Sequence, residues 1–279
     1  MRGLLFGGCS FTWGQGLYFY SDLPRQKYPL NEFTYRRNEL SDAHIRYKDI
    51  LRFPRLVANH FKTFEVVKRQ NGGGEDETFE FFKTVFNGNV GERIDHFVDD
   101  KFEYEDIEYI IIQTSQIWRN KFYFTVDGVE EFAFISWNNP EHSQNWEKLS
   151  KWMIENDKSM EYVIESHLDT QYERFVNEVK FYEDKGIKVR FLCWETDFYD
   201  LIKGDEYLMS KFIPLTYMSK TYNTIFDLHM ENKHLKIKYD VKNFKGTPPD
   251  DHHPSMECHQ VIAKNVIKKI ESEININLI

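Results

Sequence analysis

The stretch "IEYIIIQTS", residues 107–115, is an almost continuous apolar run that is rich in isoleucine. Such a run is typical of a strand in a parallel sheet covered on both faces, because neither face then needs polar side chains. Three further runs have the same character: "GLLF" (3–6), "TFEVVK" (63–68) and "IKVRFLCW" (187–194). Together the four runs predict a mostly parallel central sheet.

Helical patterns lie between and after these strands. "DILRFPRLVANHF" (49–61) precedes the second strand, and Pro54 is expected to start or kink this helix. Residues 160–186 carry apolar side chains at helical spacing and end at Gly186, which suits a helix C-cap. A closing helix is expected over 254–273. Strands that alternate with helices predict an α/β fold with a mostly parallel sheet.

Two segments depart from this alternation. Residues 14–48 are rich in tyrosine and charge, have no clear period, and indicate a long insertion or lid. In "KFYFTVDGVEEFAFI" (121–135), two alternating runs flank Asp127-Gly128, which is a strong signal for a hairpin. We therefore expect a single domain over residues 1–279, with insertions at about 14–48 and 120–158.

Bulk properties narrow the class of protein. The formal net charge of −9 argues against a nucleic-acid binder that works by neutralising phosphates. No apolar run approaches the length of a membrane span, and the start "MRGLLFGG" does not have the pattern of a signal peptide. Cys9, Cys193 and Cys258 are too few and too widely spaced to form a disulfide framework. These features favour a cytoplasmic protein, and a virus-encoded one is also compatible with them.

The segment "GGCSFTWGQG", residues 7–16, follows the first predicted strand. It is not a P-loop, because Trp13 stands where the motif needs glycine followed by lysine, and Phe19 breaks the dinucleotide fingerprint. Ser10 lies just past the carboxyl end of the strand, where open α/β sheets place their sites. The neighbouring glycines allow a sharp turn whose N–H groups can stabilise an oxyanion. A purely structural glycine turn is the alternative.

A nucleophilic serine needs a base and a group that orients the base, and "TPPDDHHPSMECHQVIA" (247–263) offers both. Asp250 and His253 are three residues apart in a loop restricted by prolines. At that spacing a carboxylate can accept from one ring nitrogen, leaving the other as general base. The alternative is an acidic helix cap beside two solvent-facing histidines.

A metal site is a further alternative for the same stretch, because it gathers His252, His253, Cys258 and His259. A closed zinc site requires spaced ligand pairs, and the sequence contains no second cluster of ligands. We therefore assign no metal and no cofactor.

The two ends of the chain together resemble the SGNH/GDSL hydrolase family of esterases and lipases. The family's "GDSxT" block is similar to Gly8-Cys9-Ser10-Phe11-Thr12, and its "DxxHP" block is similar to residues 250–254, "DDHHP". The resemblance implies a three-layer, flavodoxin-like α/β/α fold and a triad of Ser10, His253 and Asp250. Asp251 is the alternative acid. Cys9 stands where the family has aspartate, which marks a divergent member.

Two middle blocks of the family supply oxyanion donors beside the amide of the nucleophile, Ser10. The glycine block is similar to "NGGGEDE" (71–77), where Gly74 is preferred and Gly73 is nearly equal. The third block normally carries an asparagine, which is absent at the expected spacing after residues 107–115. Gln116 is the chosen replacement through its amide, and the hydroxyl of Ser115 is the alternative. Ordinary glycine turns and a polar strand end remain equally compatible with these residues.

From these residues we expect a serine esterase or acylhydrolase that acts on small acyl esters or O-acetylated carbohydrate, with acyl transfer as a variant of the same chemistry. The alternative is a catalytically inactive member of the fold that serves as a binding or assembly module. In that alternative the aromatic insertions form an interface, including one between copies of this chain.

Overall fold

The computed structural model describes residues 1–8, 12, 49–68, 74–87, 94–96, 103–135, 145–236 and 253–276. Its centre is a five-stranded sheet in the order β3-β2-β1-β4-β7. Strands β1 (Gly3–Gly7), β2 (Glu65–Lys68), β4 (Ile107–Gln113) and β7 (Lys188–Leu192) are parallel, and they confirm the four predicted strands. The edge strand β3 (Ile94–His96), which the sequence did not reveal, runs antiparallel to β2.

The order of the strands determines where a site is expected. Strand β1 lies in the middle, the chain forms β2 on one side of it, and then crosses to β4 on the other side. In open α/β sheets, ligands bind outside the carboxyl ends of the strands at the point where the direction of winding reverses. Here that point lies between β1 and β4.

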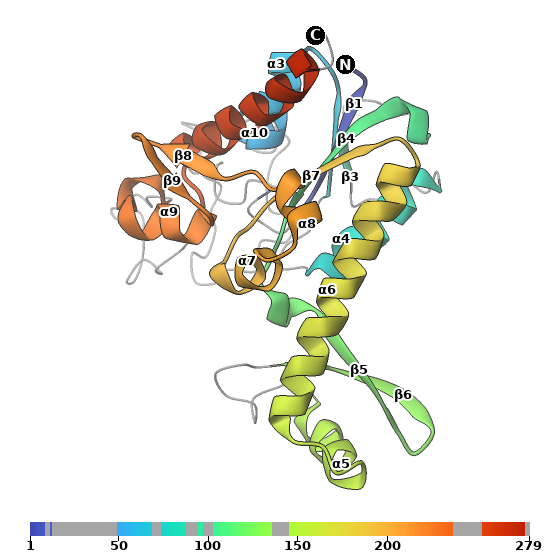
Figure 1. Cartoon of the computed structure of the whole chain (residues 1–279). Helices are drawn as coiled ribbons and strands as arrows, with labels where there is room; N and C mark the ends of the chain where they lie inside the picture. The colour runs from blue at the N-terminus through green and yellow to red at the C-terminus, as the bar shows by residue number, and fades with distance from the viewer. Residues whose placement is uncertain are drawn as a thin grey trace, which may run out of the picture.

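Helices cover both faces of the sheet, so the three-layer α/β/α prediction is confirmed (Figure 1). One face packs against α4 (Glu75–Phe86), α6 (Met160–Asp184), α7 (Thr196–Ile202) and α8 (Glu206–Lys211). The other face packs against α3 (Phe53–Phe61), α9 (Ile225–Glu231) and α10 (Met256–Ile276). Because both faces are buried, the central strands carry apolar side chains at successive positions, as the sequence predicted.

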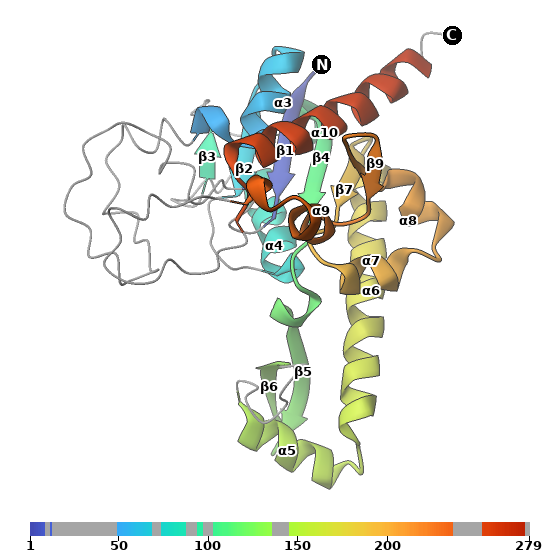
Figure 2. The same cartoon turned by 90° about the vertical axis from the view of Figure 1, so that its left-hand side faces the viewer.

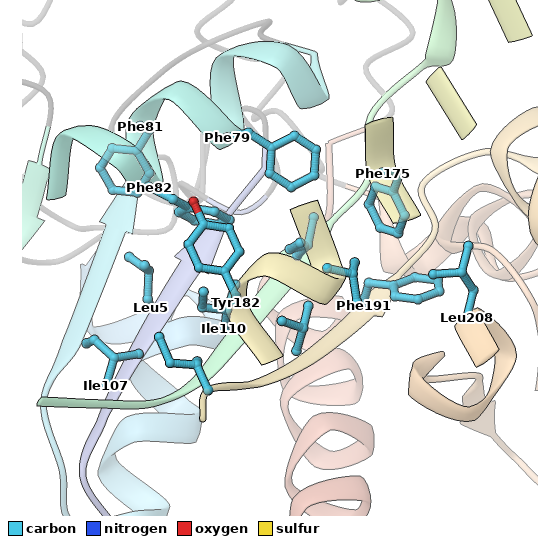
Figure 3. Packing of buried hydrophobic residues seen from close by; sticks show 14 of the residues in the cluster. Leu5, Phe79, Phe81, Phe82, Ile107, Ile110, Phe175, Tyr182, Phe191 and Leu208 are labelled. Carbon is cyan, nitrogen blue, oxygen red and sulfur yellow. The ribbon is translucent and has the colours of Figure 1, made fainter. Parts of the chain in front are cut away.

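Aromatic rings fill much of the layer between the sheet and α4, α6, α7 and α8 (Figure 3). Phe175 contacts Phe191 edge to face, with ring centroids 5.2 Å apart, and Phe82 contacts Tyr182 in the same way at 5.7 Å. Such pairs add to the stabilisation that comes from burying the rings. A large part of the high aromatic content therefore serves the core.

The three predicted helices are present, with their ends set by identifiable residues. Pro54 lies in the first turn of α3, where its missing N–H costs no helical hydrogen bond. The hydroxyl of Ser159 accepts from the N–H of Tyr162 and caps α6, and Gly186 follows that helix with a φ of 80°. The hydroxyl of Ser255 accepts from the N–H of Cys258, so α10 begins just after Pro254.

An arm projects from the carboxyl edge of the sheet (Figures 1 and 2). It consists of the hairpin β5 (Lys121–Val126) and β6 (Val129–Phe134), helix α5 (Trp146–Glu155) and the first half of α6. The predicted Asp127-Gly128 turn is confirmed, with φ angles of 53° and 75°. The arm has its own buried cluster, which includes Phe122, Phe124, Ala133, Leu149 and Val163.

Smaller elements connect these parts. A second hairpin, β8 (Leu215–Tyr217) and β9 (Lys220–Tyr222), precedes α9. Short 3₁₀ turns occur at η3 (Tyr104–Asp106), η4 (Ile117–Arg119) and η6 (Lys233–Leu235). The first predicted insertion, residues 14–48, lies outside the described residues. Within the described part of the chain, no helix is long and apolar enough to cross a bilayer.

Candidate functional site

The end of β1 is fixed against the end of β4 by residues on both sides of Ser10. Gly8 has a φ of 153°, which side-chain-bearing residues rarely adopt, and a Cβ atom there would lie 2.2 Å from Oγ1 of Thr12 and 3.0 Å from the carbonyl oxygen of Gln113. The buried hydroxyl of Thr12 donates to Oε1 of Gln113 over 2.9 Å. The two ends of the segment that contains the predicted nucleophile therefore meet at the switch point of the sheet. Ser10 itself, and Cys9, lie outside the described residues.

Gly74 stands at the N-cap of α4, directly against the loop that follows β4. A Cβ atom at this position would lie 2.2 Å from Oδ1 of Asn120 and 2.9 Å from the carbonyl oxygen of Arg119. The close approach explains why the position needs glycine although its φ is an ordinary −85°. Gly73 lies outside the described residues.

The loop after β4 contains Ser115 and Gln116. The side-chain amide of Gln116 donates to Oε1 of Glu195 over 2.6 Å, and its carbonyl oxygen accepts from Nε of Arg119 over 3.1 Å. The hydroxyl of Ser115 is buried and has no hydrogen-bond partner within the described residues. Of the two predicted donors, Ser115 therefore has the uncommitted group.

A buried polar network joins Gly74 and Ser115. Glu75 accepts from the N–H of Ser115 over 2.5 Å and from the side-chain amide of Asn120 over 2.7 Å. Burial raises the pKa of Glu75, and these hydrogen bonds oppose that rise because they favour the ionised carboxylate. Sequence reasoning missed both Glu75 and Asn120. The only signals were an acid directly after the glycine run and an asparagine in the loop after an apolar strand.

His253 stands two residues before the cap of α10 and is half-buried. Pro254 next to it pairs with Lys236, and the N–H of Ser255 donates to the carbonyl oxygen of Leu235 over 2.7 Å. These contacts hold the start of α10 against the end of η6. The predicted acid Asp250, its alternative Asp251, and His252 lie outside the described residues, so the predicted triad is represented here by His253 alone.

The other residues that were weighed as metal ligands are committed to packing contacts. Nδ1 of His259 accepts from the N–H of Phe53 over 3.1 Å, and Nε2 of His229 lies 3.1 Å from the sulfur of Cys258. Burial lowers the pKa of His259 to about 3, and the nearby His229 and His253 add to the effect. Among the described residues, no group of three or more His, Cys, Asp or Glu side chains is arranged to hold a metal ion.

Comparison with known proteins gives one structural likeness. No protein-family model matches the chain, and no curated protein matches its sequence. A solved structure aligns with 97% of this chain and 68% of its own, at a TM-score of 0.42 and 14% sequence identity. Its description reads "The active site of a carbohydrate esterase displays divergent catalytic and non-catalytic binding functions".

Proposed function

We propose that this chain is a serine ester hydrolase of the SGNH/GDSL type, with Ser10 as nucleophile, His253 as general base and Asp250 as the acid that orients His253. The observation that carries the proposal is the meeting of Gly8 and Thr12 with the end of β4 at the switch point of the sheet. These two residues flank Ser10 in the sequence, and an α/β sheet of this kind places its site at that point.

The proposed reaction follows the covalent route. His253 takes the proton of the Ser10 hydroxyl while the serine oxygen attacks the ester carbonyl. The resulting oxyanion is stabilised by the amides of Ser10 and Gly74 and by a third donor from the loop after β4. His253 then gives its proton to the leaving alcohol, and an acyl-enzyme remains. Water attacks the acyl group by the same proton transfers in reverse order and releases the acid.

The third donor is either the Ser115 hydroxyl or the Gln116 amide. The contacts of Gln116 with Glu195 and Arg119 favour Ser115, whose buried hydroxyl has no hydrogen-bond partner within the described residues. Loss of one oxyanion donor typically slows acyl transfer by about 10²–10³-fold. We expect a loss of this size for Ser115→Ala and a much smaller one for Gln116→Ala.

The proposed substrates are small acyl esters or O-acetylated carbohydrate. A serine-histidine pair with an oxyanion site suits any ester carbonyl of accessible size, which includes both kinds of substrate. Transfer of the acyl group to another alcohol in place of water would use the same residues.

Labelling with a fluorophosphonate probe tests the proposal, because the probe reacts only with an activated serine. The wild type is compared with Ser10→Ala and His253→Ala, and intact mass and peptide mapping locate the adduct. We expect a single adduct on Ser10 in the wild type and none in either variant. A folded wild-type protein that takes up no probe would contradict the proposal.

A binding or assembly module without catalysis is the second candidate. The arm favours it, because Tyr123 on the outer side of the hairpin is 50% exposed and Ile154 on α5 is 81% exposed. Exposed apolar side chains on a projecting element are common at contact surfaces. This candidate predicts no adduct on Ser10, and a sedimentation experiment would then test whether copies of this chain associate.

A further inference from the structure

Glu75 connects two segments that lie 40 positions or more apart in the sequence. It is the first residue of α4 and is 4% exposed. One carboxylate oxygen accepts from the N–H of Ser115, and the other accepts from the side-chain amide of Asn120. A single buried side chain therefore ties the start of α4 to both ends of the loop around η4.

The connection is reciprocal. Oδ1 of Asn120 accepts from the N–H of Asp76 over 3.1 Å, and Oδ2 of Asp76 accepts from the N–H of Lys121 over 3.2 Å. Gly74 completes the contact, since its Cα approaches Asn120 so closely that no side chain fits. The relative position of Gly74 and Ser115 is thus fixed by a set of hydrogen bonds, in addition to the apolar packing of α4 and Ile117 in one cluster.

The partners of Glu75 distinguish it from a second buried glutamate. Glu65, at the opposite end of β2, is 1% exposed and forms ion pairs with Arg52 at 2.9 Å and with Arg55 at 3.0 Å. Within the described residues, the hydrogen-bond partners of Glu75 are amide N–H groups rather than cations. A buried carboxylate without a cation is costly. The presence of such a group at the carboxyl edge of the sheet points to a geometric role.

We propose that Glu75 is a positioning residue of the candidate site, which fixes the distance between the Gly74 amide and the Ser115 donor. The inference rests on the proposed esterase function. Both groups donate to the same oxyanion. A shift of either segment therefore weakens the stabilisation that the two donors give to the oxyanion. A displacement of about 1 Å in such a constellation can slow a reaction by about 10²-fold.

Exchange of the two partners tests the role. In Glu75→Gln, the new side chain can still accept from Ser115, but its NH₂ group then faces the NH₂ group of Asn120. In Asn120→Asp, two carboxylates face one another. In the double variant, the amide at position 75 donates to the carboxylate at position 120, which still accepts from the N–H of Asp76. The hydrogen bonds of the network are then restored in reversed polarity.

The measurement is the rate of fluorophosphonate addition to Ser10, taken under conditions where denaturation curves show every variant folded. We expect each single variant to react about 10- to 100-fold more slowly and the double variant to recover most of the wild-type rate. Glu65→Gln is the matched control, since it makes the same change in an equally buried glutamate at the other end of β2. It is expected to lose stability while its folded molecules keep the wild-type rate.

The outcomes separate the two proposals. A wild type that is not labelled overturns the esterase function and this inference with it. A labelled wild type whose rate is unchanged by Glu75→Gln overturns the inference alone. The same holds if the folded double variant stays as slow as the single variants, or if Glu65→Gln is as slow as Glu75→Gln, because general loosening would then explain the loss.

Discussion

Gly74 shows how the site depends on the absence of a side chain at one position. In Gly74→Ala the new methyl group would overlap Oδ1 of Asn120 and the backbone of Arg119. Relief of that overlap must move either α4 or the loop after β4. We expect a loss of about 1–3 kcal/mol in the free energy of unfolding. We also expect Ser10 labelling to slow by about 10²-fold, because the amide at position 74 moves with the helix.

Gly204 provides a control for this substitution. It lies between α7 and α8, and a Cβ atom there would meet nothing within 4 Å. Gly204→Ala is therefore expected to leave both the stability and the labelling rate close to wild type. Equal behaviour of the two variants in urea denaturation and in labelling would refute the close contact at Gly74.

Helix α10 and helix α3 meet at His259, and this contact makes stability depend on pH. An unfolded histidine has a pKa near 6.5, whereas burial lowers the pKa of His259 to about 3. Between these values the unfolded chain binds a proton that the folded chain excludes. The contribution of His259 is therefore complete above about pH 6.5 and decreases as the pH falls toward 3, at up to about 1.4 kcal/mol per pH unit.

His259→Gln isolates this effect, because its amide oxygen can still accept from the N–H of Phe53 but does not titrate. We expect the variant to lose stability at pH 7. We also expect its stability to change less steeply than that of the wild type between pH 6.5 and 4.5. Urea denaturation at several pH values measures both curves. Parallel curves would show that His259 is not held neutral by burial.

The four parallel strands could be predicted because each is buried on both faces and reads as an apolar run without help from distant residues. The hairpin at Asp127-Gly128 could also be predicted from local sequence, because its turn needs two neighbouring residues with positive φ. The edge strand β3 and the hairpin β8–β9 could not, because strands of three residues have too few positions to show a period.

Residues of the candidate site could be predicted only where they belong to a local sequence motif. Gly74 stands in a visible glycine run, but its need for glycine comes from Asn120, a contact that exists only in the folded chain. Glu75 follows Gly74 in an acidic stretch that resembles any solvated helix start, and its burial depends on the loop after β4. The contact of Gln116 with Glu195 could not be predicted, since Glu195 follows β7 and is 79 positions away in the sequence.

At the scale of the whole molecule, the arm and the sheet have separate hydrophobic clusters but share α6. Val163, near the start of α6, lies in the cluster of the arm, whereas Phe175 and Val179 lie in the cluster against the sheet. At the base of the arm, Nε2 of His167 donates to the carbonyl oxygen of Ile117 over 3.2 Å. Burial lowers the pKa of His167, which favours the neutral form of the ring. Within the described residues, the chain enters the arm through the loop around η4 and leaves it through α6, and the N–H of Lys121 at the base of the arm donates to Asp76 in α4.

This arrangement predicts that the arm can be loosened without unfolding the sheet. Leu149 is fully buried in the cluster of the arm, and Leu149→Ala removes contacts worth about 2–5 kcal/mol. We expect faster hydrogen exchange over residues 121–165, unchanged protection in β1 and β4, and Ser10 labelling within about threefold of wild type. Leu228→Ala, an equally buried change in α9, is the matched control and should reduce protection in the sheet. If Leu149→Ala instead lowers protection equally in the arm and in β1, the two clusters form one cooperative unit. The stability of the arm then also contributes to the stability of the sheet that positions the candidate site.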